Sequence, residues 1–192
     1  MDEPNLLGAH LVKDGDIIIA MPSSGFHSNG YSLVRHIIKK ANLDLNFIVT
    51  EYGISAGEVF LKPTEIYALD CLALMRGMKD KLHGFSHITG GGITENTLRV
   101  IPDGLTAVYD RSTWALPVEM EFMAQMGQLN RPDMERAWNC GIGMSAIVDS
   151  GSAELAIKSL AARGMNAWQA GVIQKRETGQ TGSILVGDYA KR

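Results

Sequence analysis

The chain has 192 residues, of which 45% are hydrophobic and 20% are charged. These values are typical of a soluble globular protein, and the length fits one domain, 1–192, that can bury a sizeable core. The formal net charge of −3 excludes the basic excess that nucleic-acid-binding and membrane-surface proteins usually carry. We therefore expect neither nucleic acid nor a membrane as a partner.

The two cysteines, Cys71 and Cys140, provide neither a disulfide framework nor a C-x-x-C motif for metal or redox chemistry. This usage favours a reducing cytoplasm. No apolar run approaches the roughly 20 residues of a membrane span, and the acidic N-terminus lacks the basic and apolar regions of a signal peptide. The expected location is therefore cytoplasmic.

Strand-like and helix-like segments alternate along the chain. Short apolar runs predict six strands, over 16–21, 85–89, 105–109, 144–148, 168–173 and 183–186. Helical spacing of apolar residues predicts helices over 30–41, from Pro63 to about 77, 94–101, 116–127 and 152–164, with a helical turn at 133–138. Residues 50–62 have no clear period and are expected to form a loop. The alternation predicts an α/β (α+β) domain with about six strands and four or five helices.

The loop 22–30 joins the first strand to the first helix, and Ser28 or Asn29 is a suitable N-cap for that helix. Ser152 is expected to cap the last helix. Free N–H groups at a helix start, together with glycines and hydroxyls, can hold a phosphate. The candidate ligands in this loop are Ser23, Ser24, Gly25, Ser28 and Asn29. The alternative is a plain turn in which His27 is an ordinary hydrogen-bonded side chain, and no Walker A motif occurs in the chain.

A second loop, 87–96, contains three consecutive glycines before a predicted helix. Such a run costs entropy and serves no packing purpose, so we expect the backbone here either to approach a ligand closely or to adopt unusual dihedral angles. The candidate ligands are Gly90, Gly91, Gly92, Glu95 and Asn96. In the alternative interpretation, Glu95 complements the helix dipole and Asn96 caps the helix.

The third loop, 139–143, precedes a predicted strand. Asn139 either donates its amide to a ligand or stabilises the turn, and a buried, inert Cys140 is favoured over a nucleophile. The histidines His27 and His87 lack metal-ligand spacing, and no G-x-S-x-G motif occurs, so the sequence predicts no metal site in this chain.

The three loops carry long motifs that resemble those of aminoimidazole ribonucleotide synthetases, the phosphoribosylformylglycinamidine cyclo-ligases. Residues 23–35 resemble the family's S-S-G-x-H-S-N-G-[YF]-S-L-[VI]-R, and residues 89–96 resemble T-G-G-G-x-x-E-N. Residues 138–144 resemble F-N-C-G-[VI]-G-M, with Trp138 in place of phenylalanine, and 61–67 resemble L-x-P-T-[RE]-I-Y. The resemblance runs from about residue 8 to residue 187 and is confined to the C-terminal domain of these enzymes.

This resemblance implies a three-layer α/β/α sandwich with a mixed sheet and partly ferredoxin-like topology. It also implies an ATP- and Mg²⁺-dependent closure of formylglycinamidine ribonucleotide to aminoimidazole ribonucleotide, a step of purine biosynthesis. Full-length enzymes of this family are homodimers whose N-terminal half supplies most ATP and metal ligands. In this chain, His27 and His87 would transfer protons or donate hydrogen bonds, and the loop residues named above would bind the nucleotide substrate.

The family's N-terminal half has no counterpart in this sequence. We therefore expect substrate binding but no ATP-dependent ring closure by this chain alone. Two alternatives stay open from sequence: a non-catalytic phosphate- or nucleotide-binding module of the same superfamily, and a domain of this fold without ligand affinity in isolation.

Overall fold

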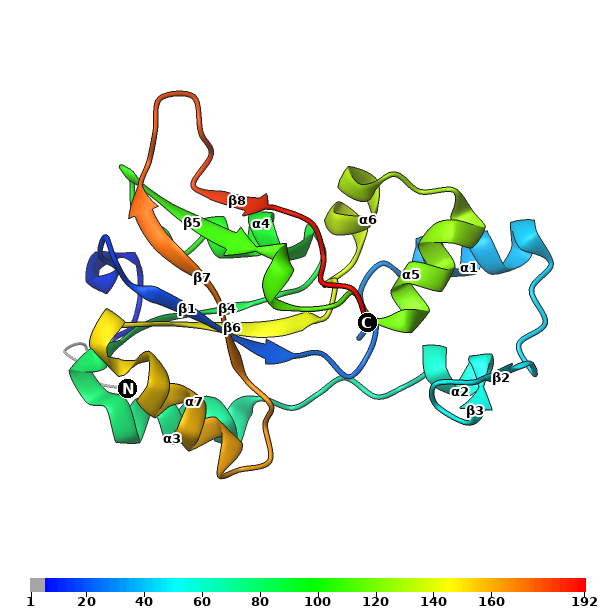
Figure 1. The fold of residues 1–192 in the computed structure, drawn as a ribbon, viewed down its shortest axis with the longest axis horizontal. Helices are drawn as coiled ribbons and strands as arrows, with labels where there is room; N and C mark the ends of the chain where they lie inside the picture. The colour runs from blue at the N-terminus through cyan, green and yellow to red at the C-terminus, as the bar shows by residue number, and fades with distance from the viewer. Residues whose placement is uncertain (1–5) are drawn as a thin grey trace.

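The computed structural model describes residues 6–192, and a six-stranded sheet runs through it in the order β4-β6-β1-β7-β5-β8 (Figure 1). The strands of this sheet are β1 (Ile17–Pro22), β4 (Leu82–His87), β5 (Leu105–Asp110), β6 (Ile142–Val148), β7 (Trp168–Lys175) and β8 (Ser183–Val186). Neighbouring strands are antiparallel except for β5 and β8, which are parallel. All six predicted strands are therefore present, and the expected mixed sheet is confirmed.

The described residues form seven α-helices, rather than the four or five expected. They are α1 (Tyr31–Ala41), α2 (Ala56–Phe60), α3 (Ala68–Met78), α4 (Gly92–Leu98), α5 (Val118–Gly127), α6 (Arg131–Ala137) and α7 (Ala153–Ala161). Short 3₁₀ turns occur at Ala9–Leu11, Lys79–Lys81, Arg111–Thr113 and Ser150–Ser152. No helix in this part of the chain is both long and apolar enough to cross a membrane.

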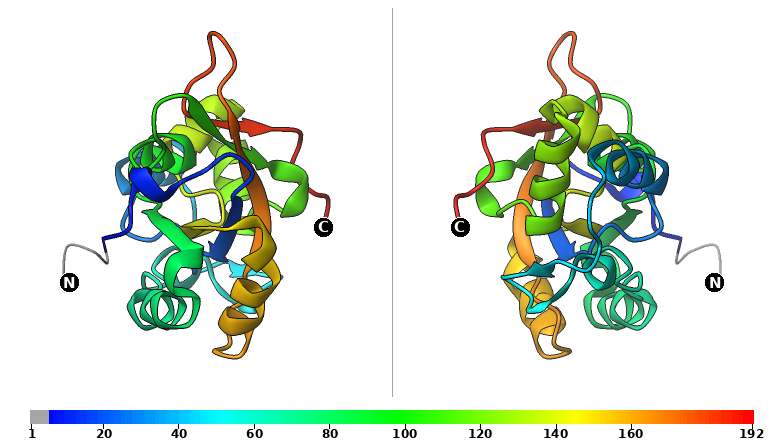
Figure 2. Two further views of the ribbon diagram at one scale, coloured as in Figure 1. Left: turned by 90° about the vertical axis from the view of Figure 1, so that its left-hand side faces the viewer. Right: turned by 90° about the vertical axis from the view of Figure 1, so that its right-hand side faces the viewer.

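The central strand β1 separates two hydrophobic cores, because its side chains alternate between the two faces of the sheet. Ile19 and Met21 lie in one core, with residues of α3 and α7, whereas Ile18 and Ala20 lie in the other, with Ile93 of α4. Helices thus cover both faces of the sheet (Figure 2), which confirms the three-layer sandwich.

The prediction of a loop over 50–62 is wrong. The strands β2 (Ile48–Val49) and β3 (Ile54–Ser55) form a small hairpin, and α2 follows directly. Ser55 begins α2 through a capping box: its hydroxyl accepts from the backbone N–H of Glu58, and the Glu58 carboxylate accepts from the backbone N–H of Ser55. With only five residues, α2 is too short to show helical periodicity in the sequence.

The helix predicted to open at Pro63 begins only at Ala68. The preceding residues are held away from helical geometry by contacts with the first loop. The Ser24 hydroxyl donates to the carbonyl of Pro63 at 2.6 Å, and the Tyr67 hydroxyl donates to the carbonyl of Pro22 at 2.7 Å. Tertiary contacts therefore override the local signal for a helix start.

The predicted N-caps also differ from the structure. The N-cap of α1 is Gly30, with φ of 69°, instead of Ser28 or Asn29, and no side chain caps this helix. Ser152 precedes α7 as expected, but its hydroxyl makes no capping hydrogen bond. The helix predicted over 94–101 is α4, which begins at Gly92 and ends at Leu98.

Candidate functional site

The three motif-bearing loops meet at one end of the sheet. Strand β6 lies between β4 and β1 and is antiparallel to both. The loop that precedes β6 therefore emerges beside the loops that follow β1 and β4. This arrangement brings residues that are more than 100 positions apart into one site, as in the 2.9 Å hydrogen bond from Ser23 to Asn139.

Asn139 ties the first and third loops together. Its Oδ1 accepts from the Ser23 hydroxyl and from the backbone N–H of Gly141, both at 2.9 Å, and its Nδ2 donates to the carbonyl of Gly25 at 2.8 Å. Asn139 is fully buried. Of the two roles predicted for Asn139, the geometry fits stabilisation of the turn. Ser23 and Gly25 take part in the same hydrogen bonds and therefore also stabilise the loops.

His27 is buried at the centre of the first loop, in a left-handed conformation with φ of 57°. Its Nε2 accepts from the backbone N–H of Ser24 at 3.1 Å, so the proton of the neutral ring lies on Nδ1. Burial, and then the charge of nearby His87, lowers the pKa of His27 from its usual 6.5 to about 4. At neutral pH the ring is therefore an uncharged N–H donor, and its buried Nδ1 has no partner among the described residues.

Tyr67, which the sequence analysis did not single out, lies between the two histidines. Its ring centroid is 6.2 Å from that of His27 and 6.2 Å from that of His87. Gly143 lies against this cluster, and a Cβ there would collide with the Tyr67 hydroxyl and with Cε1 of His27. His87 itself is exposed, so of the two predicted catalytic histidines it is the one open to solvent. The position of Tyr67 at the end of the L-x-P-T-[RE]-I-Y motif could have indicated that it belongs to the site.

Asn96 organises the glycine loop from within. Its Nδ2 donates to the carbonyls of Gly92 at 2.8 Å and Gly90 at 3.2 Å, and its Oδ1 accepts from the Thr89 hydroxyl at 3.0 Å. Asn96 is buried, whereas Glu95 is exposed. The amide of Asn96 is thus occupied by the loop, and Glu95 is left as the accessible polar side chain of this motif.

Two of the three glycines adopt the unusual dihedral angles expected from the sequence, and the expectation that they serve no packing purpose is wrong for Gly92. Gly91 and Gly92 have φ of 96° and 69°, which strongly favours glycine. In addition, a Cβ at Gly92 would collide with the carbonyl oxygen of Glu135 in α6. Gly90 meets neither restriction, because a Cβ there would point into open space. Among these three residues, only Gly90 lacks a structural reason to be glycine.

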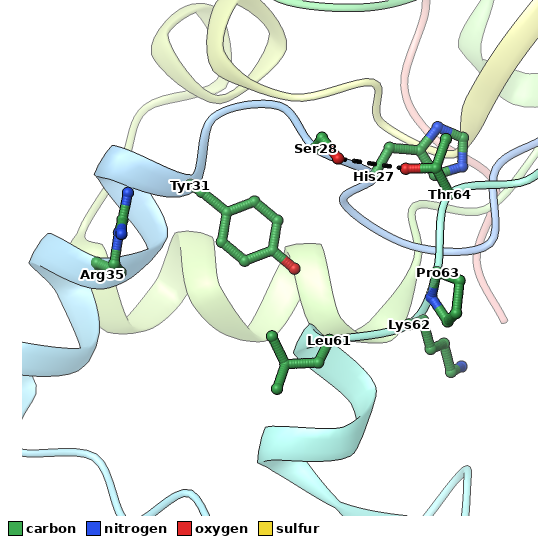
Figure 3. A pocket seen from close by; sticks show the side chains of 8 residues that line it. All are labelled: His27, Ser28, Tyr31, Arg35, Leu61, Lys62, Pro63 and Thr64. Carbon is green, nitrogen blue, oxygen red and sulfur yellow. Dashed lines mark hydrogen bonds between the residues drawn. The ribbon is translucent and has the colours of Figure 1, made fainter.

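A pocket of about 390 Å³ lies between the start of α1 and the segment that follows α2 (Figure 3). We call it the α1 pocket; its polar lining consists of His27, Ser28, Tyr31, Arg35, Lys62 and Thr64. The hydroxyls of Ser28 and Thr64 lie 3.5 Å apart. Ser28 and His27 were predicted from the sequence to be site residues. Arg35 and Thr64 lie within the motifs at 23–35 and 61–67 but were not singled out, and neither was Lys62. The helical spacing of Tyr31 and Arg35, four residues apart, could have indicated that they share a face.

The predicted ligands of the first loop fall into two groups. The first group already forms hydrogen bonds within the protein: Ser23 and Gly25 bond to Asn139, and Ser24 bonds to Pro63 and His27. Ser28 is exposed and Asn29 is half-buried, and the side chain of Asn29 makes no hydrogen bond with the described residues. These two side chains are the ones that the loop leaves available to a ligand.

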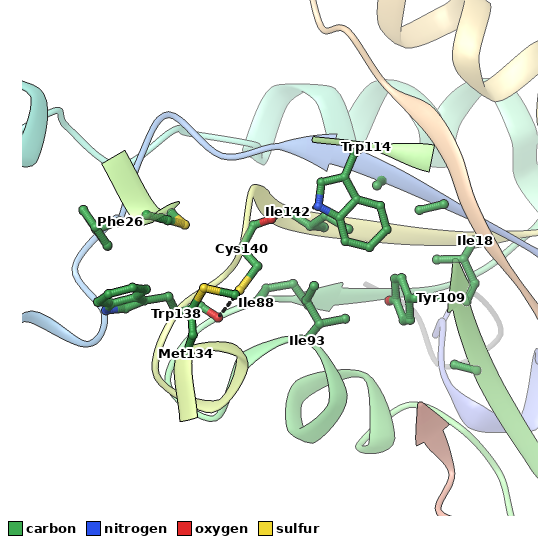
Figure 4. Packing of buried hydrophobic residues seen from close by; sticks show 14 of the residues in the cluster. Ile18, Phe26, Ile88, Ile93, Tyr109, Trp114, Met134, Trp138, Cys140 and Ile142 are labelled. Carbon is green, nitrogen blue, oxygen red and sulfur yellow. Dashed lines mark hydrogen bonds between the residues drawn. The ribbon is translucent and has the colours of Figure 1, made fainter. Parts of the chain in front are cut away.

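Buried aromatic side chains pack beneath the first and third loops (Figure 4). The rings of Phe26 and Trp138 pack edge to face with centroids 4.9 Å apart, and both residues are buried. Gly30 lies directly on the Trp138 ring, so a Cβ there would collide with it. Cys140 is also buried, and burial raises the pKa of its thiol to about 12, which suits the inert cysteine expected from the sequence.

Metal ligation finds no support within residues 6–192. Those residues place no three His, Cys, Asp or Glu side chains together as a potential metal site. The donor set of residues 6–192 therefore does not fit a Mg²⁺ site built from side chains alone.

Comparison with known proteins identifies a family. The family model described as AIR synthase related protein, C-terminal domain, matches residues 13–182. A Streptomyces fradiae protein provisionally named phosphoribosylformylglycinamidine cyclo-ligase is 46% identical over 183 residues, which are 93% of this chain and 100% of that protein. The phosphoribosylformylglycinamidine cyclo-ligase of Burkholderia cenocepacia (strain HI2424) is 38% identical over 186 residues. That match covers 97% of this chain and 52% of the relative, so the chain spans about half the length of this enzyme.

Solved structures share the fold at much lower identity. Thiamine-monophosphate kinase from Stenotrophomonas maltophilia K279a has a TM-score of 0.63 at 15% identity, covering 99% of this chain and 56% of that chain. AaThiL, solved in complex with AMPPCP and TMP, has a TM-score of 0.54 at 11% identity, covering 97% of this chain and 52% of that chain. Given the family match over most of its length, this chain belongs to the AIR synthase related proteins, as their C-terminal domain.

Proposed function

We propose that this chain is the C-terminal half of an ATP-dependent cyclo-ligase that converts formylglycinamidine ribonucleotide to aminoimidazole ribonucleotide. One observation carries the proposal: three loops that hold the family's long motifs converge at one end of the sheet. The cyclo-ligase of Burkholderia cenocepacia, which matches almost the whole chain, supports the same assignment. The contribution of this half is the binding of the nucleotide substrate.

In this proposal, the residues of this chain bind and orient the nucleotide substrate, and they do not activate ATP. Ser28 and Asn29 provide polar side chains beside the uncapped start of α1, where free N–H groups favour an anion. His27 donates a hydrogen bond from Nδ1 to an oxygen of the substrate, because its ring is neutral and Nε2 is already an acceptor. His87, which is exposed, is the histidine available for proton transfer.

ATP and Mg²⁺ are held by a second half in this proposal. The side chains of residues 6–192 do not fit a metal site, and AaThiL, which shares the fold, was solved with AMPPCP. An apolar face beside the site supports a covering partner: Ile66, which is 77% exposed, lines a surface pocket together with half-buried Phe85 and Met144. A contiguous apolar surface of this kind is typical of an interaction site. The second half, and in the family a homodimer, would complete the enzyme.

A second candidate function is a non-catalytic module that binds a phosphate or nucleotide. The observation that favours it is the Streptomyces fradiae relative, which this chain matches over the whole length of that protein. In that case the same loops bind a ligand, but no ring closure follows when a second half is supplied.

The test combines binding and turnover. Formylglycinamidine ribonucleotide, ATP and inorganic phosphate are each titrated into the chain by calorimetry, using wild type, a Ser28→Ala/Asn29→Ala variant and Ser150→Ala as a control. Ser150 is exposed at the far end of β6. We expect saturable substrate binding that only the loop variant loses.

The N-terminal half of the Burkholderia cenocepacia relative is then added, and aminoimidazole ribonucleotide is assayed with ATP and Mg²⁺. We expect no turnover by this chain alone and measurable turnover by the mixture. Substrate binding without turnover would favour the non-catalytic module, and the absence of both would refute the proposal.

A further inference from the structure

The α1 pocket has the charge of an anion site. Arg35 and Lys62 line it, and no carboxylate does so among the described residues. The Nζ atom of Lys62 lies 3.6 Å from the centre of the Tyr52 ring, so its charge already has a partner. Arg35 is exposed and forms no ion pair with any residue in 6–192. Neither cation has an ion-pair partner among these residues, but the ammonium of Lys62 is held over the Tyr52 ring, whereas the guanidinium of Arg35 has no such contact with any of them.

Neutral donors converge on the same pocket. The hydroxyls of Ser28 and Thr64, 3.5 Å apart, are both exposed, and α1 begins at Gly30 with no side-chain cap. The first N–H groups of this eleven-residue helix are therefore free, and its positive end faces the loop. His27, which is only 3% exposed, also lines the pocket, and its Nδ1 has no partner. An unpaired buried donor of this kind is unusual in a folded protein.

The residues that the motifs predicted as phosphate ligands are less available. Ser23, Ser24 and Gly25 use their side chains or carbonyl groups within the protein. A phosphate needs donors that are not already used, and it is bound best by an arginine fork that can donate two parallel hydrogen bonds. The α1 pocket provides both.

We propose that Arg35 binds the phosphate monoester of the ligand in the α1 pocket, where the Ser28 and Thr64 hydroxyls and the start of α1 donate to the remaining oxygens. This inference rests on the proposed function for the identity of the ligand, a ribonucleotide. It assigns the 5′-phosphate to one pocket and makes Arg35 the residue that distinguishes a phosphorylated ligand from its nucleoside.

The test measures binding of ribose 5-phosphate, with ribose as the non-phosphorylated comparison, by calorimetry on the full chain. The variants are Arg35→Gln and Thr64→Val, and the matched control is Lys40→Gln, which removes one positive charge from the same helix outside the pocket. Circular dichroism and thermal unfolding verify that each variant is folded.

We expect ribose 5-phosphate to bind and ribose not to bind. Arg35→Gln weakens the binding by about tenfold or more, since a hydrogen bond to a charged group is worth that factor. Thr64→Val weakens it by a smaller factor, and Lys40→Gln leaves it unchanged. Equal affinity of wild type and Arg35→Gln, equal loss in Lys40→Gln, or no binding to wild type would each overturn the inference.

Formylglycinamidine ribonucleotide, titrated in parallel, separates this inference from the proposed function. Arg35-dependent binding of ribose 5-phosphate without tighter binding of the full nucleotide supports the phosphate site and contradicts the assigned substrate. Tight binding of the full nucleotide that is unaffected by Arg35→Gln contradicts the phosphate site and leaves the assigned substrate standing.

Discussion

Acidification is expected to destabilise this protein through His27. The buried imidazole has a pKa of about 4 in the folded chain, whereas its usual value is 6.5. As the pH falls below 6.5, the unfolded chain takes up a proton at this residue, but the folded chain does so only near pH 4. The stability that His27 contributes is therefore fully present above pH 6.5 and is lost as the pH falls toward 4.

The two pKa values set the size of this effect. At pH 4.5 the unfolded chain is almost fully protonated at His27 and the folded chain is mostly neutral, which corresponds to a loss of about 2.5 kcal/mol relative to pH 7.5. For a fold of typical stability, such a loss is a substantial fraction of the free energy of unfolding.

Urea unfolding of wild type and His27→Asn, followed by circular dichroism between pH 7.5 and 4.5, measures this contribution. Asparagine tolerates the left-handed conformation at this position but does not titrate. The variant is expected to be less sensitive to acid than wild type by about 2.5 kcal/mol over this range. Parallel pH profiles for the two proteins would refute a buried neutral His27.

Three substitutions and one matched control, Gly90→Ala, test the loop scaffold, each by urea unfolding. Gly92→Ala is expected to lower the free energy of unfolding by more than about 3 kcal/mol, because it combines a positive φ with a collision against the Glu135 carbonyl. Gly90→Ala is expected to change it by less than about 0.5 kcal/mol. Similar values for both variants would contradict this description of the loop. Asn139→Ala removes three hydrogen bonds at a fully buried site and is expected to cost about 3–5 kcal/mol; a loss below 1 kcal/mol would show that water replaces the side chain. Trp138→Phe is expected to stay within about 1 kcal/mol of wild type, because the lost packing is offset by removal of a buried indole N–H without a partner; a loss above 3 kcal/mol would indicate that this N–H is in fact hydrogen-bonded.

The sequence predicted the sheet better than the helices. The central strands β1 and β6 are compact apolar runs, because they are buried on both faces of the sheet. Strand β4 contains two histidines, a glycine and a serine, and it begins three residues before the predicted start at 85. The starts of the helices were less predictable, as α3 shows: Pro63 and Thr64 are good first-turn residues, yet contacts with Ser24 hold this segment extended. Such long-range contacts have no local signature in the sequence.

The same division applies to the site. Motifs located the loops, but they did not distinguish residues that build a loop from residues that are open to a ligand. Asn96 and Asn139 both looked like ligands because they are polar and stand beside glycines, yet both are buried and bonded to backbone groups. Arg35 ends the motif at 23–35 but was not named as a ligand, because it lies in the predicted helix rather than in the loop. Only the packing of α1 against residues 61–64 places it in a pocket.

The position of β6 between β1 and β4 has a consequence for how this protein acquires its site. The first loop ends at residue 30, but Asn139, which holds this loop in place, and the strand that aligns it with the glycine loop come more than 100 residues later. Closing so long a segment is an entropically costly and slow step in folding. On the ribosome, the chain therefore cannot assemble the candidate site until β6 has emerged, long after the candidate residues of the first loop have been made.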